Sequence, residues 1–371
     1  MTTLTSRERL LRTWRRQPTD RVPISTYEMV GWDMNSWYNQ QPSYKKLMQV
    51  IRENTDCLYS CSYSAPDLAE QNYKTVEKWE EDDLTFQKIT LHTPKGDLTA
   101  VYRDQRTLLT TWCIEHFLKD IDDLDKWLSL PHEPGEVTIE RVKSAENTIG
   151  DNGILVIETG DPILVIAELF RFEDFMLNWA IHRDRILYAM DVIFERQFEA
   201  LKKALELGVT GLSFRLVGQE YGTPPYFSPD DFRDLVVKYD GRLIELIHQY
   251  SGYVRIHCHG RIGKVLPMFI EMNADGTDPV EAPPSGDIEL SEVKRKYGDK
   301  LVLFGNMQLR DLEFATPAGI DKMVKKMMEA AKKDGGYVIM PTASPIDANL
   351  KRETESNYYA YIEAALKYGK Y

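Results

Sequence analysis

The sequence alternates repeatedly between short apolar stretches with a strand pattern and longer stretches with a helical pattern. GILVIETG (153–160) is followed by a helical pattern through 183–207, and KLVLFGN (300–306) by another over 317–334. Strands that alternate with helices in this way form a parallel sheet, because each helix carries the chain back to the start of the next strand. The pattern therefore predicts an α/β protein.

About eight stretches qualify as strands, which is the number that a TIM barrel requires. They are RVPISTY (21–27), DCLYSCSY (56–63), GILVIETG (153–160), GVTGLSFRLVG (208–218), GYVRIHCHG (252–260), DGTDPVE (275–281), KLVLFGN (300–306) and YVIMP (337–341). We expect a single (β/α)8 TIM barrel over residues 1–371, since no repeat, low-complexity tract or long linker supports a second domain.

One segment breaks the alternation of strands and helices. LTFQKITLHTPKGDLTAVYRD (84–104) alternates apolar and polar residues on both sides of a PKGD turn. Such a pattern is typical of an antiparallel hairpin. We expect a β-hairpin inserted after the second strand, where it covers or walls one end of the barrel.

The composition excludes several classes of function. With 43% hydrophobic and 28% charged residues, the chain has the composition of an ordinary globular protein. A net charge of −12, without clusters of Lys and Arg, argues against nucleic acid as a ligand. The N-terminal residues interleave charges with apolar residues, unlike a secretory signal, and the longest apolar runs fall short of the roughly 20 residues that span a bilayer. We expect a cytoplasmic protein without a membrane partner.

The segment RIHCHG (255–260) is the main candidate for a metal site. Successive side chains of a strand point to opposite faces, so His257 and His259 share one face and Cys258 points to the other. Glu281 ends the next strand, so all three side chains would gather at the carboxyl ends of the strands, where TIM barrels bind substrates. Two histidines and a carboxylate form a known catalytic zinc set, although the same pattern also fits a strand end that is merely polar.

Other side chains at strand ends are weaker candidates. Glu220 follows the fourth strand and could act as a general acid or base, or as a further metal ligand, or could simply cap its loop. Asp161 and Asn306 could hydrogen-bond a substrate or stabilise turns. Tyr27 and Trp32 could wall an aromatic pocket or pack their own loop.

Several segments resemble the uroporphyrinogen decarboxylase superfamily. They are SRERLLRTWRRQPTDRVPIS (6–25), SPDDFRDLVVKYDGRLIELIH (228–248), HCHG (257–260), DPVEAPPSGD (278–287), VLFGNMQ (302–308) and NYYAYIEAALKYGKY (357–371). The resemblance covers nearly the whole chain and implies a (β/α)8 barrel. The superfamily includes the haem-pathway decarboxylase and cobalamin-dependent methyltransferases, which move methyl groups between small molecules and a corrinoid protein.

The sequence departs from the decarboxylase itself at the first strand. The decarboxylase has an arginine-containing loop of the type MRQAGRY there, which binds the carboxylates of its substrate. This chain has TYEMVGWDMNSWY (26–38) instead. Because arginine is the natural bidentate partner of a carboxylate, the substitution argues against a polycarboxylate substrate.

The methyltransferases of the superfamily are the better match. Members that methylate a thiol carry an HxC zinc motif at this strand and a further cysteine near the eighth strand. Here His259 takes the position of the motif cysteine, and MPTASP (340–345) offers no cysteine. A zinc site of His257, His259 and Glu281 would hold fewer thiolates, which makes Zn²⁺ a better Lewis acid for an oxygen.

The resemblance therefore implies a corrinoid-dependent methyltransferase of the O-demethylase type. It would remove a methyl group from a methoxylated, aromatic compound and pass it to the Co(I) of a separate corrinoid protein that docks transiently. No corrinoid-binding DxHxxG pattern occurs in the chain, so the corrinoid would come from that partner. The alternatives are a cofactor-free, decarboxylase-like lyase acting on a small carboxylic acid, and a barrel that only binds a tetrapyrrole or corrinoid.

Overall fold

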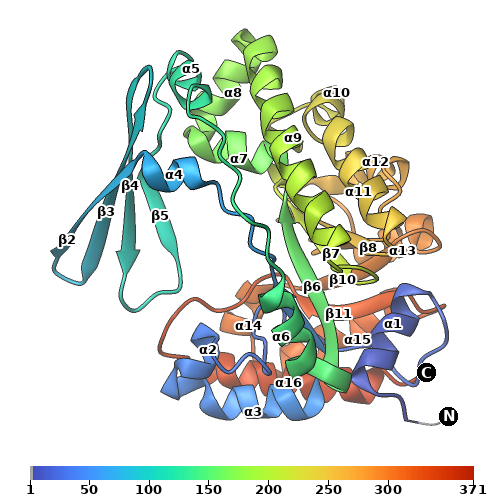
Figure 1. The fold of residues 1–371 in the computed structure, drawn as a ribbon. Coiled ribbons are helices and arrows are strands. Elements are labelled where there is room, and N and C mark those ends of the chain that lie inside the picture. Colours follow the sequence, from blue (N-terminus) through green and yellow to red (C-terminus); the bar gives the residue numbers. More distant parts are fainter. Residues whose placement is uncertain (1–2) are drawn as a thin grey trace.

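The computed structural model describes residues 3–371 and has a curled, parallel sheet of seven strands at its centre (Figure 1). In spatial order the strands are β1 (Cys57–Cys61), β6 (Gly153–Gly160), β7 (Ser213–Val217), β8 (Tyr253–His257), β9 (Gly276–Asp278), β10 (Val302–Met307) and β11 (Tyr337–Pro341). Each neighbouring pair is parallel. Their order in space follows their order in the chain, as in a TIM barrel.

Residues 22–25 join the two edges of this sheet. Ile24 forms a parallel bridge with Ile339 of β11, and on the other side the Asp56 N–H donates to the Ile24 carbonyl at 2.7 Å. The strand expected at 21–27 is thus reduced to isolated bridges, in part because Pro23 has no N–H to donate. The segment still fills the first position of the barrel, and we call it the seam.

Helices surround the sheet. They are α1 (Ser6–Trp14), α2 (Trp37–Gln40), α3 (Lys45–Asn54), α4 (Leu68–Asn72), α5 (Asp123–Leu128), α6 (Glu140–Ile149), α7 (Pro162–Leu169), α8 (Phe172–Ile181), α9 (Arg183–Glu206), α10 (Pro229–Phe232), α11 (Lys238–Gln249), α12 (Leu266–Glu271), α13 (Leu290–Tyr297), α14 (Leu309–Phe314), α15 (Pro317–Ala331) and α16 (Arg352–Tyr368). Within residues 3–371, no helix is both long enough and apolar enough to cross a bilayer.

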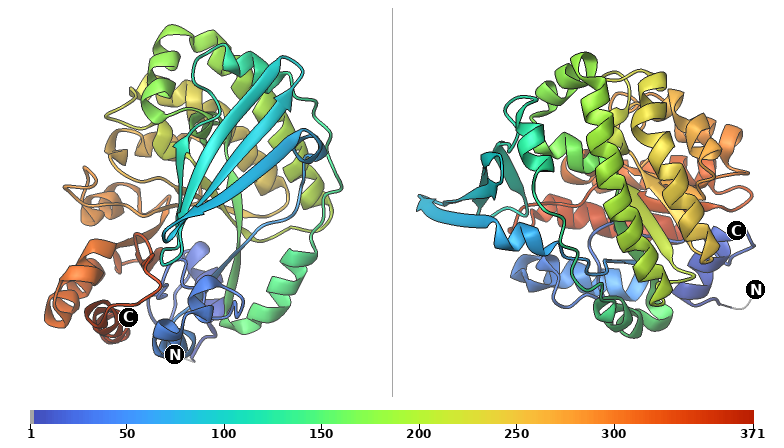
Figure 2. Two further views of the ribbon diagram at one scale, coloured as in Figure 1. Left: turned by 90° about the vertical axis from the view of Figure 1, so that its left-hand side faces the viewer. Right: turned by 45° about the horizontal axis from the view of Figure 1, so that its top comes forward.

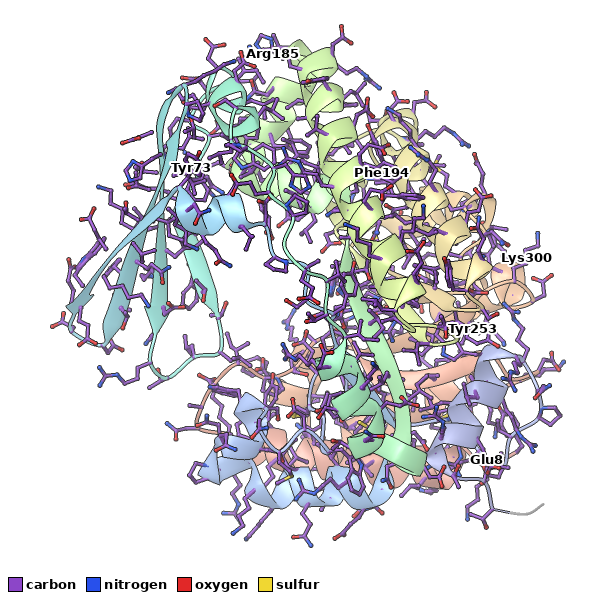
Figure 3. The ribbon with its side chains drawn as sticks, in the orientation of Figure 1. Glu8, Tyr73, Arg185, Phe194, Tyr253 and Lys300 are labelled. Atoms are coloured by element: carbon purple, nitrogen blue, oxygen red, sulfur yellow. The ribbon has the colours of Figure 1, made fainter. Side chains whose placement is uncertain are left out.

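Helix α1 closes the base of the barrel. Thr5 and Glu8 form a capping box at its start, which satisfies free N–H groups of the first turn. Near its end, the Trp14 ring stacks on Tyr253 with centroids 5.5 Å apart and packs against Phe304 at 5.1 Å. Figure 3 labels Tyr253 where β8 begins, next to α1. The base is thus filled by rings, which leaves the opposite end of the strands for a site.

A second, antiparallel sheet stands beside the barrel (Figures 1 and 2). Its strands are β2 (Lys74–Glu81), β3 (Leu84–Thr93), β4 (Gly96–Gln105) and β5 (Thr111–Glu115), paired in that order. The segment 84–104, where we expected a hairpin, supplies β3 and most of β4. In the chain this sheet follows β1, which occupies the second position of the barrel counted from the seam.

The antiparallel sheet is attached to the barrel at two places. Leu98 and Leu91 are buried on the face that packs toward α5, whereas every residue of β2 is exposed. At the other end, the Leu109 N–H donates to the Ile346 carbonyl at 2.7 Å, in the loop after β11. The sheet therefore spans from α5 to the loop that follows β11.

Candidate active site

A layer of charged side chains lies inside the barrel, above its apolar base. Glu158, Arg215 and Arg255 are neighbours in the register of β6, β7 and β8, so their side chains lie at one height. Arg215 Nη1 donates to Glu158 at 3.1 Å, and Arg255 Nε lies 2.9 Å from Asp278 Oδ1. Buried charges persist only when they are paired, and here each arginine has a carboxylate. This layer forms the floor of the barrel mouth.

His257, the last residue of β8, is held in a fixed orientation. Its Nδ1 lies 2.7 Å from Asp278 Oδ2, and its Nε2 lies 3.5 Å from the Tyr27 hydroxyl. Burial lowers the pKa of His257 to about 4, although the charge of Asp278 opposes that shift. A neutral imidazole whose Nδ1–H is bound by a carboxylate has its lone pair on Nε2, where the Tyr27 hydroxyl now lies and where a ligand could take its place.

His259 and Glu281 form an ion pair beside His257. His259 Nδ1 lies 3.3 Å from Glu281 Oε2, and the Gly260 N–H donates to the same oxygen at 2.8 Å. Burial works against the charged form of His259, but the hydrogen bond and charge of Glu281 outweigh it and raise the pKa of His259. The rings of His257 and His259 meet edge to face, with centroids 4.7 Å apart.

An open cavity of about 470 Å³ lies at this end of the barrel. His259, Glu281 and Glu220 line one side of it. The other walls include the aromatic side chains Phe172, Tyr221 and Tyr226. Volumes of about 300–1,000 Å³ with apolar walls and a few polar groups are typical of small-molecule sites.

Glu220 has the character of an acid. It follows β7 in a short 3-10 helix (Gln219–Gly222), and its Oε2 is buried without a hydrogen-bond partner. Burial raises the pKa of Glu220 above its ordinary value. A carboxyl group whose proton is held more tightly, at the wall of a cavity, can donate that proton to a substrate.

His257, His259 and Glu281 are suitable zinc ligands in their chemistry, but their side chains are not arranged around one point. Two imidazoles and a carboxylate are suitable ligands, and Asp278 orients His257 as such ligands usually are oriented. Among the residues that the structure describes, no three His, Cys, Asp or Glu side chains are arranged as a metal-binding group. Glu281 is engaged by His259 and Gly260, so it would have to turn to bind a metal together with both histidines.

Cys258 is buried on the other side of β8, with 1% of its surface exposed. Burial raises the pKa of its thiol well above the usual range. A thiol in this state is neither a good nucleophile nor a good metal ligand.

The remaining candidates lie at different places. Tyr27 belongs to the site, since Arg215 donates a short hydrogen bond to its hydroxyl. Asp161 is fully buried and caps α7 by accepting from the Leu164 N–H at 2.8 Å. Asn306 donates to the Val280 carbonyl at 2.9 Å and lines a neighbouring cavity. Trp32 packs beside β1 and lines the same small cavity as Tyr27.

Sequence reasoning missed several residues of the site. Arg215 and Arg255 gave a signal, because each is a charged residue in the middle of an otherwise apolar strand. Asp278 gave none, since its contact with His257 depends on the register between β8 and β9. Phe172 begins α8, Tyr221 lies in the short 3-10 helix after β7 and Tyr226 in the loop that follows it, and in such segments no period predicts the direction of a side chain.

Comparisons with known proteins agree with this barrel. The family model described as uroporphyrinogen decarboxylase (URO-D) matches residues 113–345, which is more than half of the chain. The chain belongs to the uroporphyrinogen decarboxylase family. Within this family, the matched residues include Glu220, both histidines and Glu281. No curated protein sequence matches the chain.

Solved structures add evidence on the fold of this family member. A methyltransferase from Methanosarcina mazei is 17% identical, and the match covers 98% of this chain and 99% of that chain with a TM-score of 0.59. At this identity the likeness shows the shared fold. A protein assigned as a fructose-1,6-biphosphate aldolase, from Coccidioides immitis, is 13% identical over 62% of this chain and 74% of that chain. Its TM-score of 0.29 is too low to indicate a shared fold.

Proposed function

We propose that this protein is the methyltransferase of an O-demethylase system, which removes the methyl group of a methoxylated aromatic compound and passes it to the Co(I) of a separate corrinoid protein. The observation that carries the proposal is the cavity in which His259, Glu281 and Glu220 face aromatic walls, beside a His257 oriented by Asp278. The likeness in fold to a methyltransferase supports the same reaction class.

The residues of the cavity match the needs of ether cleavage. Phe172, Tyr221 and Tyr226 would hold the ring of the substrate. When the methyl group leaves to Co(I), the electron pair of the carbon–oxygen bond stays on oxygen, and the proton of Glu220 converts the phenoxide to a phenol. Zn²⁺ bound by His257, His259 and Glu281 would supply a Lewis acid for that oxygen. Asp278 would keep Nε2 of His257 directed into the site.

The open rim of the barrel would admit the corrinoid partner. Displacement at carbon requires Co(I), the methyl carbon and the ether oxygen in one line, so the cobalt would approach from the open side of the cavity. The partner must leave with its methyl group, which favours a transient complex.

The test combines the purified protein, a reduced corrinoid protein and a panel of methoxyaromatic compounds. We expect conversion of Co(I) to methyl-Co(III), followed in the visible spectrum, and release of the corresponding phenol. Glu220→Gln should lower the rate of methyl transfer by about 10²–10⁴-fold, because it removes the proton donor. Zinc content and thermal melting of this variant should match those of the wild type.

One outcome would decide for the alternative. If no donor gives methyl-Co(III), and the protein alone releases CO₂ from a carboxylated substrate, the methyltransferase proposal is wrong. The protein would then be a cofactor-free lyase of the decarboxylase type. Loss of activity in Glu281→Gln with unchanged zinc affinity would instead keep the reaction and move the third ligand elsewhere.

A further inference from the structure

A second cavity, of about 510 Å³, lies beside the carboxyl end of β6, where Glu158 of the charged layer forms part of its lining. It runs between the end of β6, the loops at 63–67 and 132–137, and the outer part of α9. It shares no lining residue with the cavity of His259 and Glu281. We call it the α9 trough. Its volume is also within the usual range for small-molecule sites.

The walls of the α9 trough are largely apolar. Tyr63, Trp127, Val137, Val165 and Ile193 line it. These side chains also pack against the main core, which holds them in place. Rigid apolar and aromatic walls favour a flat, apolar ligand, because its surface is removed from water at little cost in side-chain order.

Among the described side chains, the α9 trough is lined by two cations and one carboxylate that have no ion-pair partner within 4 Å. Arg196 and Lys203 lie seven residues apart on one face of α9, and neither has an ion-pair partner within 4 Å among the described side chains. Asp67 is paired with His132 and Glu158 with Arg215, so these carboxylates are already compensated. Glu199 lies on the same wall, and Glu199 and Lys203 are both exposed to solvent, which screens their charges, whereas Arg196 is half-buried. Arg196 is therefore the main cation of the trough.

Two polar groups of the α9 trough lack partners. The Thr159 hydroxyl is buried, with 7% of the residue exposed, and makes no hydrogen bond. The Gln197 Oε1 is buried and also makes none. Both atoms are shielded from solvent, and Gln197 Oε1 is an acceptor that only a donor could satisfy. The cavity, its apolar walls and its cations are therefore what indicates a ligand.

We propose that the α9 trough binds a small aromatic carboxylate. Its ring would lie against Trp127 and Ile193, and its carboxylate would face Arg196 and Lys203. The guanidinium of Arg196 already lies 5.9 Å from the centre of the Trp127 ring, so ring and cation are adjacent. The site is independent of the proposed methyl transfer.

The test compares benzoate with benzamide, which has the same shape but no charge. Calorimetric titration and quenching of tryptophan fluorescence should show tighter binding of benzoate to the wild-type protein. The double variant Arg196→Gln, Lys203→Gln should weaken the binding of benzoate by at least about tenfold, because a hydrogen bond to a charged group contributes about 1.5–3 kcal/mol. The affinity for benzamide should stay unchanged. Lys202→Gln is the matched control, since Lys202 lies next to Lys203 but does not line the trough.

Two further variants locate the site. Ala200→Phe should abolish binding of both ligands, because Ala200 lines the trough and the larger ring fills it. His259→Ala should leave benzoate binding unchanged, which separates the trough from the barrel mouth. Equal affinity for benzoate and benzamide, equal losses in Lys202→Gln and the double variant, or loss of binding in His259→Ala would overturn the proposal. If Ala200→Phe does not fold, the charge variants alone decide.

Discussion

At the scale of single residues, the period of two along β8 separates reactive from inert side chains. His257 and His259 reach the mouth of the barrel, and Cys258 lies buried between β8 and the helices outside it. This arrangement explains how three adjacent residues can have three different environments. It also gives a direct test of the ligand assignment.

We predict that His257→Ala and His259→Ala each remove most of the bound zinc and most of the activity, whereas Cys258→Ser changes both little. Zinc content per chain, measured by atomic emission after dialysis against a weak chelator, is the readout. Circular dichroism checks that each variant folds. Zinc loss in Cys258→Ser together with zinc retention in His259→Ala would contradict the assignment.

The buried carboxyl groups of Asp240 and Asp161 make the stability of the protein depend on pH. Burial raises the pKa of Asp240 to about 7, against the hydrogen bond that it accepts from Gln219 at 2.7 Å. Burial and the charge of Asp240 also raise the pKa of Asp161. A folded-state pKa above the unfolded value means that the protonated carboxyl contributes stability below about pH 4, and that this contribution is lost as the pH rises through about 7.

We therefore predict that the wild-type protein loses free energy of unfolding between pH 5 and pH 8. In Asp240→Asn this decrease in the free energy of unfolding should be smaller by about 1 kcal/mol or more, because the amide cannot ionise. Urea unfolding at both pH values measures the difference. A wild type and a variant with parallel pH profiles would show that Asp240 titrates normally in the folded protein.

At the scale of secondary-structure elements, the antiparallel sheet has one attached part and one free part. Leu98 of β4 is 2% exposed and belongs to the main core, whereas Val76 of β2 is 42% exposed. The two residues therefore test how the sheet is held.

Leu98→Ala should lower the free energy of unfolding by about 2–5 kcal/mol, because it leaves a cavity in the core. Val76→Ala should change it by no more than about 0.5 kcal/mol, as is usual for exposed positions. Chemical denaturation of both variants gives the comparison. Similar losses in the two variants would contradict this and would mean that another molecule covers β2 in solution.

The elements also show what could be predicted from the sequence. The alternation of apolar strands and amphipathic helices placed seven strands, and with them the ends that carry His257, Glu281 and Glu220. Pro23 in the first stretch could have indicated the seam, because a residue without N–H weakens a strand. The contact between Asp278 and His257 could not be predicted, because it depends on how two strands are aligned. The capping role of Asp161 could have been predicted, because an Asp directly before a Pro after a strand is typical of a helix start, and here Pro162 is the first residue of α7.

At the scale of the whole molecule, function and stability are divided along the barrel axis. The base is filled by Trp14, Tyr253 and Phe304, the middle layer holds paired charges, and the mouth holds the histidines and Glu220. Residues at the mouth contribute little to the packed base. Substitutions there should change substrate or metal preference at small cost in stability.

The seam gives the barrel a preferred line of opening. On one side the Ser25 N–H donates to the Ile339 carbonyl and the Ile339 N–H to the Pro23 carbonyl, and on the other side Asp56 bonds both the N–H and the carbonyl of Ile24. The seam therefore has fewer strand-to-strand hydrogen bonds than the regular pairs of the sheet. Deuterium should therefore replace the amide hydrogens of Ile24 and Ser25 sooner than that of Ile256 in the middle of the sheet, as mass spectrometry of peptides can measure. Equal protection would contradict this. Because Tyr27 follows the seam directly and touches both Arg215 and His257, each such opening would carry it out of the mouth and briefly uncover the inner histidine.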